Sequence, residues 1–205
     1  MTTKTTVTIA CTAVLLAAGV VALSRTMTGS GYVPERVRTM QVKAEAGDAE
    51  AQLELGNAYY SGDGVLQDVD RALHWWRAAA EKGNVVAQLN LGTASMSLGE
   101  NGVKEAVKWL TKAAEAGDEG ARRNLGLLYL TGNGVGQNLR KAAVWLHRSA
   151  AQGDATAQYN LAVMFENGQG VVKDLPEARR WFERAARGGH PGAIAWMQRE
   201  ESKQD

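Results

Sequence analysis

The chain has one cysteine, three prolines and three histidines among 205 residues, and each shortage excludes some kinds of structure or site. Cys11 lies in an apolar N-terminal stretch, so the rest of the chain can hold no intramolecular disulfide, cysteine metal cluster or thiol nucleophile. Few prolines and dispersed glycines argue against long disordered segments. A formal net charge of +1 carries no footprint of nucleic-acid binding, and we expect no nucleic-acid partner.

Motifs of catalysis and metal binding are missing as well. His74, His147 and His190 do not recur at a common spacing, so they are not expected to converge on one site. The sequence has no HExxH motif, nucleophile elbow or Walker motif, and its acidic residues lack the spacing of a calcium loop. We therefore expect no catalytic residue, no metal site and no cofactor, which excludes the common enzyme classes.

The longest uncharged stretch is at the N-terminus, where Val7 to Leu23 form seventeen residues between Lys4 and Arg25. This length is at the lower limit for a membrane-spanning helix, about 17 residues. A cleaved signal peptide, an uncleaved signal anchor and a lipoprotein signal at Cys11 are the alternatives. The long apolar run and a weak cleavage site favour the anchor over the signal peptide, and the short apolar stretch before Cys11 argues against the lipoprotein signal. Residues 1–25 are thus a signal anchor or signal peptide, and residues 26–33 a linker.

The location of the protein follows from this segment. We expect an inner-membrane anchor with the following domain in the periplasm. Release into the periplasm after cleavage, or a domain facing the cytoplasm, are the alternatives. Arg25 and the basic residues after it oppose export under the positive-inside rule, whereas Lys4 favours it.

Residues beyond the linker repeat themselves with a period of 34 to 36. Four ladders share this register: Trp75, Trp109, Trp145 and Trp181; Gly47, Gly83, Gly117, Gly153 and Gly189; Ala51, Ala87, Ala121, Ala157 and Ala193; Leu55, Leu91, Leu125 and Leu161. Such ladders predict stacked copies of one supersecondary unit.

Each copy reads as two antiparallel helices, here named helix A and helix B. Helix A follows a Gly-Asp or Gly-Asn pair, in which glycine ends the previous helix and the polar side chain caps the next one. Helix B follows a Gly-x-Gly-Val turn, seen at residues 61–65, 131–135 and 167–171. A Gly-rich loop could cradle a phosphate, but three copies without a preceding strand favour helix-ending turns.

Helix B carries its own pattern. Asp68, Asn138 and Asp174 are the expected N-caps. Alanines recur around each tryptophan at helical spacing, as in Ala72 and Trp75. This pairing favours packing between helices over a ligand-binding platform of tryptophans.

These residues resemble the Sel1-like repeat, a relative of the tetratricopeptide repeat. The resemblance covers about residues 34–198 and is carried by the run from Ala51 through Gly56, Gly62 and Trp75 to Gly83. It implies an all-α protein, an α/α solenoid of helix-turn-helix repeats that binds other proteins, here preceded by an N-terminal apolar helix. Residues 34–201 would form about four repeats with capping helices, and residues 202–205 a polar tail.

Some parts depart from the pattern. The second repeat is two residues shorter and replaces the Gly-x-Gly-Val turn by residues 97–103, so we expect a shortened turn and weaker stacking there. Residues 34–46 supply a lone helix B and residues 190–201 a lone helix A. Both are expected to cap the ends of the stack.

Two polar rows on helix A are the candidate binding residues. One row holds Gln52, Gln88, Arg122 and Gln158, with Arg123 beside it; the other holds Asn90, Asn124 and Asn160. Amides both donate and accept, so a row of them suits an extended peptide backbone on a concave face. The alternative is that they hydrogen-bond between repeats. We expect the Gln/Arg row to face a partner and favour the internal role for the asparagines, which neighbour buried leucines.

Charge is unevenly distributed along the chain. Residues 35–119 hold 14 acidic and 9 basic residues, a balance of −5, whereas residues 120–205 hold 8 acidic and 12 basic residues, a balance of +4. Solvated helix faces account for this more simply than a stack with an acidic end and a basic end.

The function expected from these features is a non-catalytic scaffold or adaptor in the bacterial cell envelope. It would bind a protein or an extended peptide segment and contact the membrane through its N-terminal helix. An enzyme or ligand-binding protein acting on cell-wall material is the alternative, and it would require titratable groups that converge in a pocket.

Overall fold

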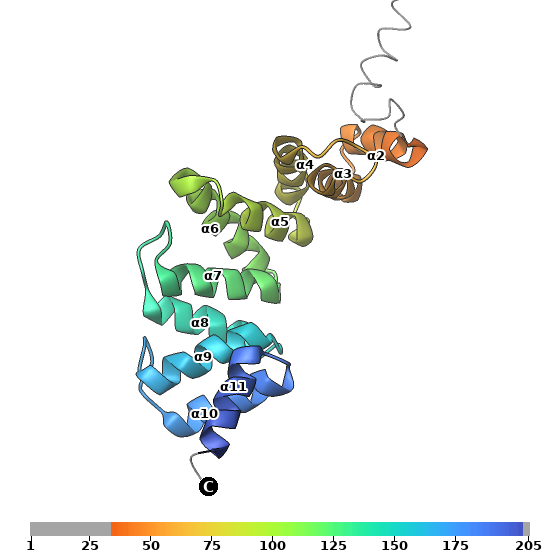
Figure 1. The fold of residues 1–205 in the computed structure, drawn as a ribbon. Coiled ribbons are helices and arrows are strands. Elements are labelled where there is room, and N and C mark those ends of the chain that lie inside the picture. Colours follow the sequence, from red (N-terminus) through yellow and green to blue (C-terminus); the bar gives the residue numbers. More distant parts are fainter. Residues whose placement is uncertain (1–33, 203–205) are drawn as a thin grey trace, which may run out of the picture. The chain divides into compact units, whose positions relative to one another are not determined.

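The computed structural model describes residues 34–202, which divide into two compact units on either side of the Asn84–Val85 bond. Unit 1 contains three helices, in which α3 packs against both of its neighbours (Figure 1). Their bounds are α2 Glu35–Glu45, α3 Ala49–Ser61 and α4 Val69–Glu81.

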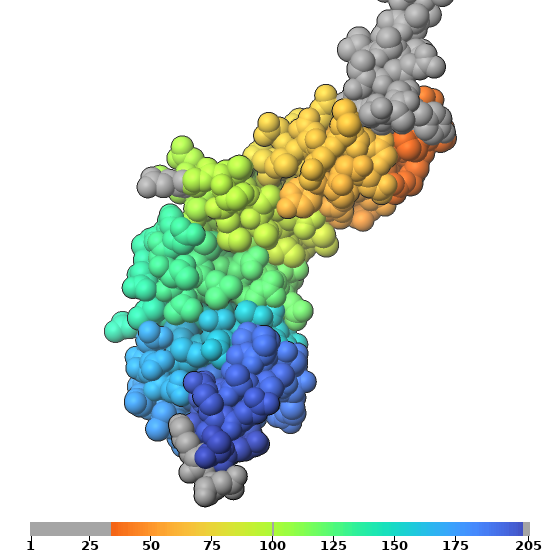
Figure 2. All heavy atoms as spheres, viewed as in Figure 1, coloured from red at the N-terminus to blue at the C-terminus, as the bar shows by residue number. Residues whose placement is uncertain are grey.

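Unit 2 is a stack of helices in chain order, and successive stretches of sequence form successive bands on its surface (Figures 1 and 2). The helices are α5 Val85–Ser95, α6 Gly99–Glu115, α7 Glu119–Thr131, α8 Leu139–Ala150, α9 Ala155–Asn167, α10 Leu175–Arg187 and α11 Pro191–Glu201. Each helix packs against the next one along the chain. All regular structure in residues 34–202 is helical, which confirms the all-α class.

The predicted apolar helix, Val7 to Leu23, lies outside the described residues, as do the linker at 26–33 and the last three residues of the polar tail. Within residues 34–202, no helix has the length and apolar character needed to cross a bilayer.

Local chemistry starts the helices as expected. Aspartate side chains cap α3, α7 and α9 by accepting a hydrogen bond from the backbone N–H three residues on, as Asp154 Oδ1 does from Ala157 at 2.7 Å. Asp68, Asn138 and Asp174 cap α4, α8 and α10 in the same way. Each cap satisfies one of the N–H groups that a helix start leaves without a partner.

The Gly-x-Gly turns are helix-ending turns, because their glycines adopt left-handed backbone angles. Gly132 is the C-cap of α7 with φ of 73°, and Gly134 follows with φ of 69°. A Cβ on Gly134 would lie 2.7 Å from Val103 Cγ2, so this second glycine also lets the turn contact the preceding helix B. No strand precedes any of these turns in residues 34–202.

Glycines in the middle of helix A bring it close to helix B. A Cβ on Gly126 would lie 2.5 Å from Leu146 Cγ, and one on Gly92 would lie 2.7 Å from Leu110 Cγ. The space left by each glycine is filled by Leu146 or Leu110, which directly follow the repeated tryptophans. The sequence pattern did not single out this position. The hairpins are therefore locked by a small residue facing a large one.

The repeated tryptophans pack between helices to different degrees. Trp109 and Trp181 are almost fully buried, whereas Trp75 and Trp145 are half-buried. In each of the last three copies a basic side chain lies over the ring, as Arg184 does over Trp181 at 4.5 Å from the ring centroid. The structure thus agrees with a packing role for this ladder.

The second repeat has the shortened turn that its sequence predicts. Only Met96, Ser97 and Leu98 separate α5 from α6. The chain enters helix B earlier, and α6 reaches 17 residues whereas α8 has 12. Gly99 starts this helix with φ of 73°.

The two lone helices exist as predicted, and α11 shows how unit 2 ends. Trp196 stacks on Phe182 with ring centroids 4.2 Å apart, and its indole N–H donates to Glu166 Oε1 at 3.0 Å. Gln198 of α11 occupies the position that is Gly126 in α7. A further helix B could not approach α11 as closely as α8 approaches α7, so α11 suits the end of a stack.

Candidate protein-binding surface

The predicted binding residues all lie on helices of the A type, but the two rows differ in how deeply their side chains are buried. We name the outer surface of α5, α7 and α9 the A-face. It comprises the asparagine row and the residues one helical turn further on: Asn90, Asn124, Asn160, Thr93, Leu127 and Val163. All six belong to unit 2, so the A-face is defined within one compact body.

The expectation that the glutamines face a partner was wrong about their exposure. Gln52, Gln88 and Gln158 expose only 5 to 7% of their surface. Gln158 Nε2 donates to the carbonyl oxygen of Ala150 at 3.1 Å, and Gln52 makes the same bond to Ala44. These carbonyls belong to the last turn of the preceding helix, where four acceptors lack intrahelical partners. Gln52 and Gln158 therefore satisfy helix ends.

Arg122 takes the same place in α7. Its Nε donates to the carbonyl oxygen of Ala114 at 3.0 Å, and its Nη1 reaches Gln152 Oε1 at 2.6 Å. Arginine provides five donors where glutamine provides two, so it can bond to the helix end and to the following loop together. Its guanidinium is committed to contacts inside the repeat stack.

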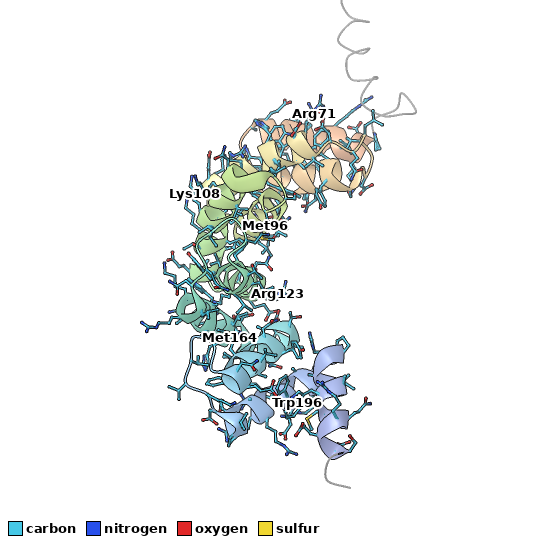
Figure 3. The ribbon with its side chains drawn as sticks, turned by 60° about the vertical axis from the view of Figure 1, so that its left-hand side comes forward. Arg71, Met96, Lys108, Arg123, Met164 and Trp196 are labelled. Atoms are coloured by element: carbon cyan, nitrogen blue, oxygen red, sulfur yellow. The ribbon has the colours of Figure 1, made fainter. Side chains whose placement is uncertain are left out.

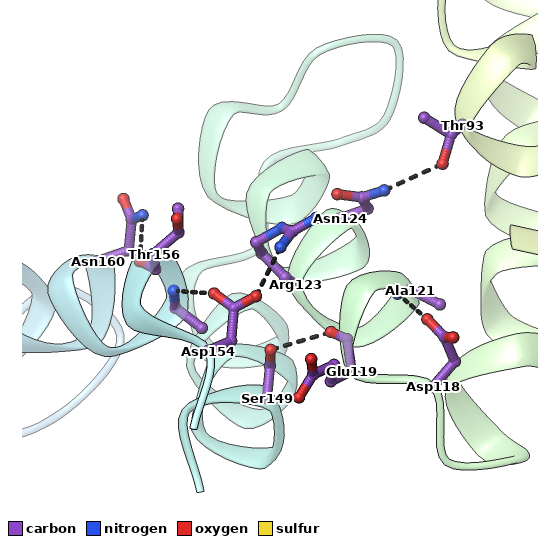
Figure 4. A network of polar contacts seen from close by, with 11 residues as sticks. Thr93, Asp118, Glu119, Ala121, Arg123, Asn124, Ser149, Asp154, Thr156 and Asn160 are labelled. Atoms are coloured by element: carbon purple, nitrogen blue, oxygen red, sulfur yellow. Dashed lines mark hydrogen bonds and ion pairs between the residues drawn. The ribbon is translucent and has the colours of Figure 1, made fainter. Parts of the chain in front are cut away.

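Arg123 pairs with the N-cap of the next helix A. Its Nη1 lies 2.6 Å from Asp154 Oδ2, while the other carboxylate oxygen of Asp154 caps α9 (Figure 4). The side chain of Asp154 is 7% exposed, so the guanidinium compensates a largely desolvated carboxylate. Arg123 thus joins α7 to α9 through a cap.

The asparagines are half-buried, and they are the more accessible of the two rows. Asn124 Nδ2 donates to Thr93 Oγ1 at 3.1 Å, and Asn160 Nδ2 donates to the carbonyl oxygen of Thr156 at 2.8 Å (Figure 4). Among the described residues nothing donates to the side-chain oxygens of Asn124 or Asn160. Asn124 and Asn160 are therefore oriented by internal bonds and keep an acceptor on the surface.

Half-buried apolar residues complete the A-face. Leu127 and Val163 pack partly onto the core of unit 2 and remain partly accessible. Leu89 and Tyr159, one residue before Asn90 and Asn160, have the same intermediate exposure. The sequence pattern did not single out these residues, because an apolar residue in an amphipathic helix is usually assigned to the core. Their position outside the buried alanine and leucine ladders could have identified them as surface residues.

The three histidines do not meet at one site in the described part of the chain. His74 and His147 are exposed, and His190 stacks on Tyr159 with ring centroids 4.3 Å apart. No three histidine, cysteine, aspartate or glutamate side chains of residues 34–202 group closely enough to hold a metal ion. A cavity of about 540 Å³ beside Trp196 contains Glu166, Arg179 and Glu200 but no histidine.

Helical hairpins of about 36 residues, with alanine, glycine and tryptophan at fixed positions, define an all-helical repeat protein. The sequence profile of the Sel1 repeat matches residues 49–84, 85–118, 120–154 and 155–190. The chain belongs to the Sel1 repeat family, whose members generally act as protein-interaction scaffolds.

Solved structures agree with this assignment. The crystal structure of c5321, a protective antigen of uropathogenic Escherichia coli with an SLR fold, has a TM-score of 0.75 and 34% identity over 82% of this chain and 36% of that one. A Sel1 repeat protein from Oxalobacter formigenes has a TM-score of 0.71 and 31% identity over 78% of this chain and 66% of that one.

A curated relative is similar over a shorter stretch. The secretory immunoglobulin A-binding protein EsiB of Escherichia coli O6:H1 is 45% identical over 40 residues, which make up 20% of this chain and 8% of EsiB. This chain thus spans a small part of EsiB and about a third of c5321.

Proposed function

We propose that this protein is a non-catalytic scaffold that binds an extended segment of another protein along the A-face of unit 2. One observation carries the proposal. Asn124 and Asn160 occupy the same register on neighbouring A-type helices, and each keeps its side-chain oxygen accessible while its nitrogen is bonded internally. Such a row offers fixed acceptors to the N–H groups of an extended backbone.

The residues next to the asparagines also suit an extended protein segment. Leu127 and Val163 lie one turn from the asparagines and are partly exposed, so they can contact apolar side chains of a bound segment. Binding would combine hydrogen bonds to the backbone with apolar contacts to alternate side chains. Because the asparagines are already oriented, little side-chain entropy would be lost on binding.

A photo-crosslinking amino acid at Leu127 tests the proposal in cells that produce the full chain. A matched variant carries the same amino acid at Val172, which is 86% exposed in the α9–α10 turn of the same unit. We expect a discrete protein adduct at Leu127 and none at Val172. Adducts of equal yield at both positions, or none at either, would contradict binding on the A-face.

A second measurement links the adduct to the asparagines. Replacing Asn124 and Asn160 together with alanine removes two acceptors, each contributing about 0.5–1.5 kcal/mol. Capture at Leu127 is then expected to fall about tenfold, because 1.4 kcal/mol corresponds to a factor of ten in affinity. Unchanged capture by a folded double variant would show that the asparagines do not bind the partner.

The proposal extends to the cell envelope. The uncharged run from Val7 to Leu23 supports a membrane tether. The expected linker, residues 26–33, is short enough to keep the repeats near the bilayer. An alkaline phosphatase fused after Asp205 is expected to be active if the repeats are periplasmic. An inactive phosphatase fusion, together with an active cytoplasmic reporter fused at the same residue, would show that the repeats face the cytoplasm and contradict this part of the proposal.

A further inference from the structure

The B-type helices of unit 2 carry a row of cations on their outer side. The row occupies three positions, four residues apart, on each of α6, α8 and α10. Its cations are Lys104, Lys108, Lys112, Arg140, Arg148, Arg180 and Arg184, while Val144 takes the central position on α8 and Pro176 the first position on α10. All of these residues are exposed. We name the cations of this row the basic stripe.

Most of the basic stripe has no counter-ion. No described carboxylate lies within 4 Å of the charged nitrogens of Lys108, Lys112, Arg140, Arg148 or Arg184, whereas Arg179 and Arg180 of α10 pair with Glu183 and Glu177. Within the stripe, Arg180 is paired with Glu177, whose hydrogen bond and charge raise the pKa of Arg180 above its usual value. The positive potential of the stripe therefore comes mainly from the five unpaired side chains.

Tryptophan rings hold several of these cations in place. Lys108 and Lys112 lie 4.8 and 4.5 Å from the centroid of Trp109, and Arg148 lies 4.9 Å from the centroid of Trp145. A cation over an indole face is attracted by the ring quadrupole. The charges thus keep a common register from one helix to the next instead of sampling the solvent independently.

The charge is specific to this side of unit 2. The A-type helices carry almost none: α5 has no charged residue, α7 has a balance of +1 and α9 a balance of −1. Figure 3 labels Lys108 of α6 on one side of the unit and Arg123 of α7 on the other. The A-face belongs to α5, α7 and α9 and the basic stripe to α6, α8 and α10, so the two surfaces differ in their chemistry.

The burial of the rings decides which partner suits the stripe. Peripheral helices that bind membranes insert exposed tryptophan, phenylalanine or leucine into the bilayer. Here Trp109 and Trp181 are 2% and 4% exposed beneath their cations and Trp145 is half-buried, and the exposed apolar residues within the row are Val144 and Pro176, neither of them tryptophan, phenylalanine or leucine. Lysine on α6 and arginine on α8 occupy the same register, so the row selects for negative charge rather than for one bidentate geometry.

We propose that the basic stripe is a second docking surface, and that its partner is an acidic protein segment with clustered aspartate and glutamate residues. The cations attract and orient such a segment across α6, α8 and α10. This surface acts independently of the A-face, so one chain can hold two partners at once.

Binding of a fluorescent oligo-glutamate peptide to the purified full chain tests this proposal. Wild-type protein is expected to bind at low ionic strength and to release the peptide as salt screens the charges. Replacing Lys108, Arg148 and Arg184 with glutamine should weaken binding about tenfold, since exposed charge pairs contribute less than 1 kcal/mol each.

A matched variant controls for net charge. Replacing Lys43, Lys173 and Arg199 with glutamine removes the same charge from exposed positions outside the stripe and should leave binding within about twofold. Exchanging Arg148 and Arg184 for lysine keeps the charge and should preserve binding, which separates lost charge from lost folding. Equal losses in the two glutamine variants would overturn the proposal, as would a folded stripe variant that binds like wild type.

Two further probes identify the partner class. Vesicles of phosphatidylglycerol and a duplex DNA are offered at matched charge concentration to the same proteins. Stripe-dependent binding of the peptide with weaker binding of both probes supports an acidic protein partner. Tighter stripe-dependent binding of the vesicles or of the DNA overturns it in favour of a lipid or nucleic-acid surface. The Asn124 and Asn160 double variant should bind the peptide like wild type, because its residues lie on the A-face.

Discussion

Replacing Gly126 with alanine tests the contact between α7 and α8 that holds the third hairpin together. Two effects oppose each other. Alanine in a helix interior is more favourable than glycine by about 1 kcal/mol. The added Cβ, however, would lie 2.5 Å from Leu146 Cγ, 2.7 Å from its Cδ2 and 3.2 Å from its backbone nitrogen. The backbone contact means that a new rotamer of Leu146 cannot relieve all of the overlap.

Overpacking of this kind costs about 1–3 kcal/mol. Subtracting the helix-propensity gain leaves a net loss of about 1 kcal/mol in the free energy of unfolding. In a chain of this size such a loss lowers the thermal midpoint by about 2–4 °C. Circular dichroism at 222 nm during thermal and urea unfolding of the full chain would measure both quantities.

A second background separates the two effects. Leu146→Ala removes the two side-chain atoms that collide with the new Cβ and leaves only the 3.2 Å contact with the backbone nitrogen, so Gly126→Ala in that background should stabilise the protein by up to about 1 kcal/mol through helix propensity. The effect of one substitution thus changes sign between the two backgrounds. Stabilisation by Gly126→Ala in the wild-type background, or equal effects in both, would refute the close contact.

Three further predictions concern the contacts that join the repeats. Gln158→Leu should lower the free energy of unfolding by about 1–3 kcal/mol in urea titrations, because the carbonyl of Ala150 loses its donor inside the protein. Asp154→Ala should lower the free energy of unfolding by about 1–2 kcal/mol because the helix cap is lost. Asp154→Asn keeps the cap and should lower it less. Equal losses in the two variants would mean that the ion pair with Arg123 contributes more than the cap. Trp196→Ala should cost about 2 kcal/mol and increase hydrogen exchange in α11 first; uniform exchange would argue against its end-capping role.

The helices were predictable because their boundaries depend on neighbours in sequence. The Asp154 side chain caps the helix that begins one residue later, and Gly132 ends α7 through its own left-handed backbone. Both effects operate within a few residues, so a ladder of such signals defines helices without any tertiary information. The shortened turn before α6 was visible for the same reason.

The polar rows on helix A show where sequence reasoning failed. Gln158 and Asn160 are two residues apart, equally polar and equally regular in the repeat. Gln158 faces the end of α8 and is buried, whereas Asn160 is half-exposed. The orientation of helix A about its axis, set by contacts with α8 and α10, decides which row meets solvent. A single helix carries no information about that rotation beyond its apolar stripe.

Sequence alone thus determined the repeat length, the helix ends and the family of this protein, because these rest on local capping, glycine backbone freedom and recurring residue types. Only the tertiary structure decided which polar residues are accessible and which cations lack a partner. Those properties depend on how each helix is packed by residues about 30 positions away, as in the pair of Arg123 with Asp154. Burial and charge pairing are set by that packing, and the binding surfaces of the protein follow from them.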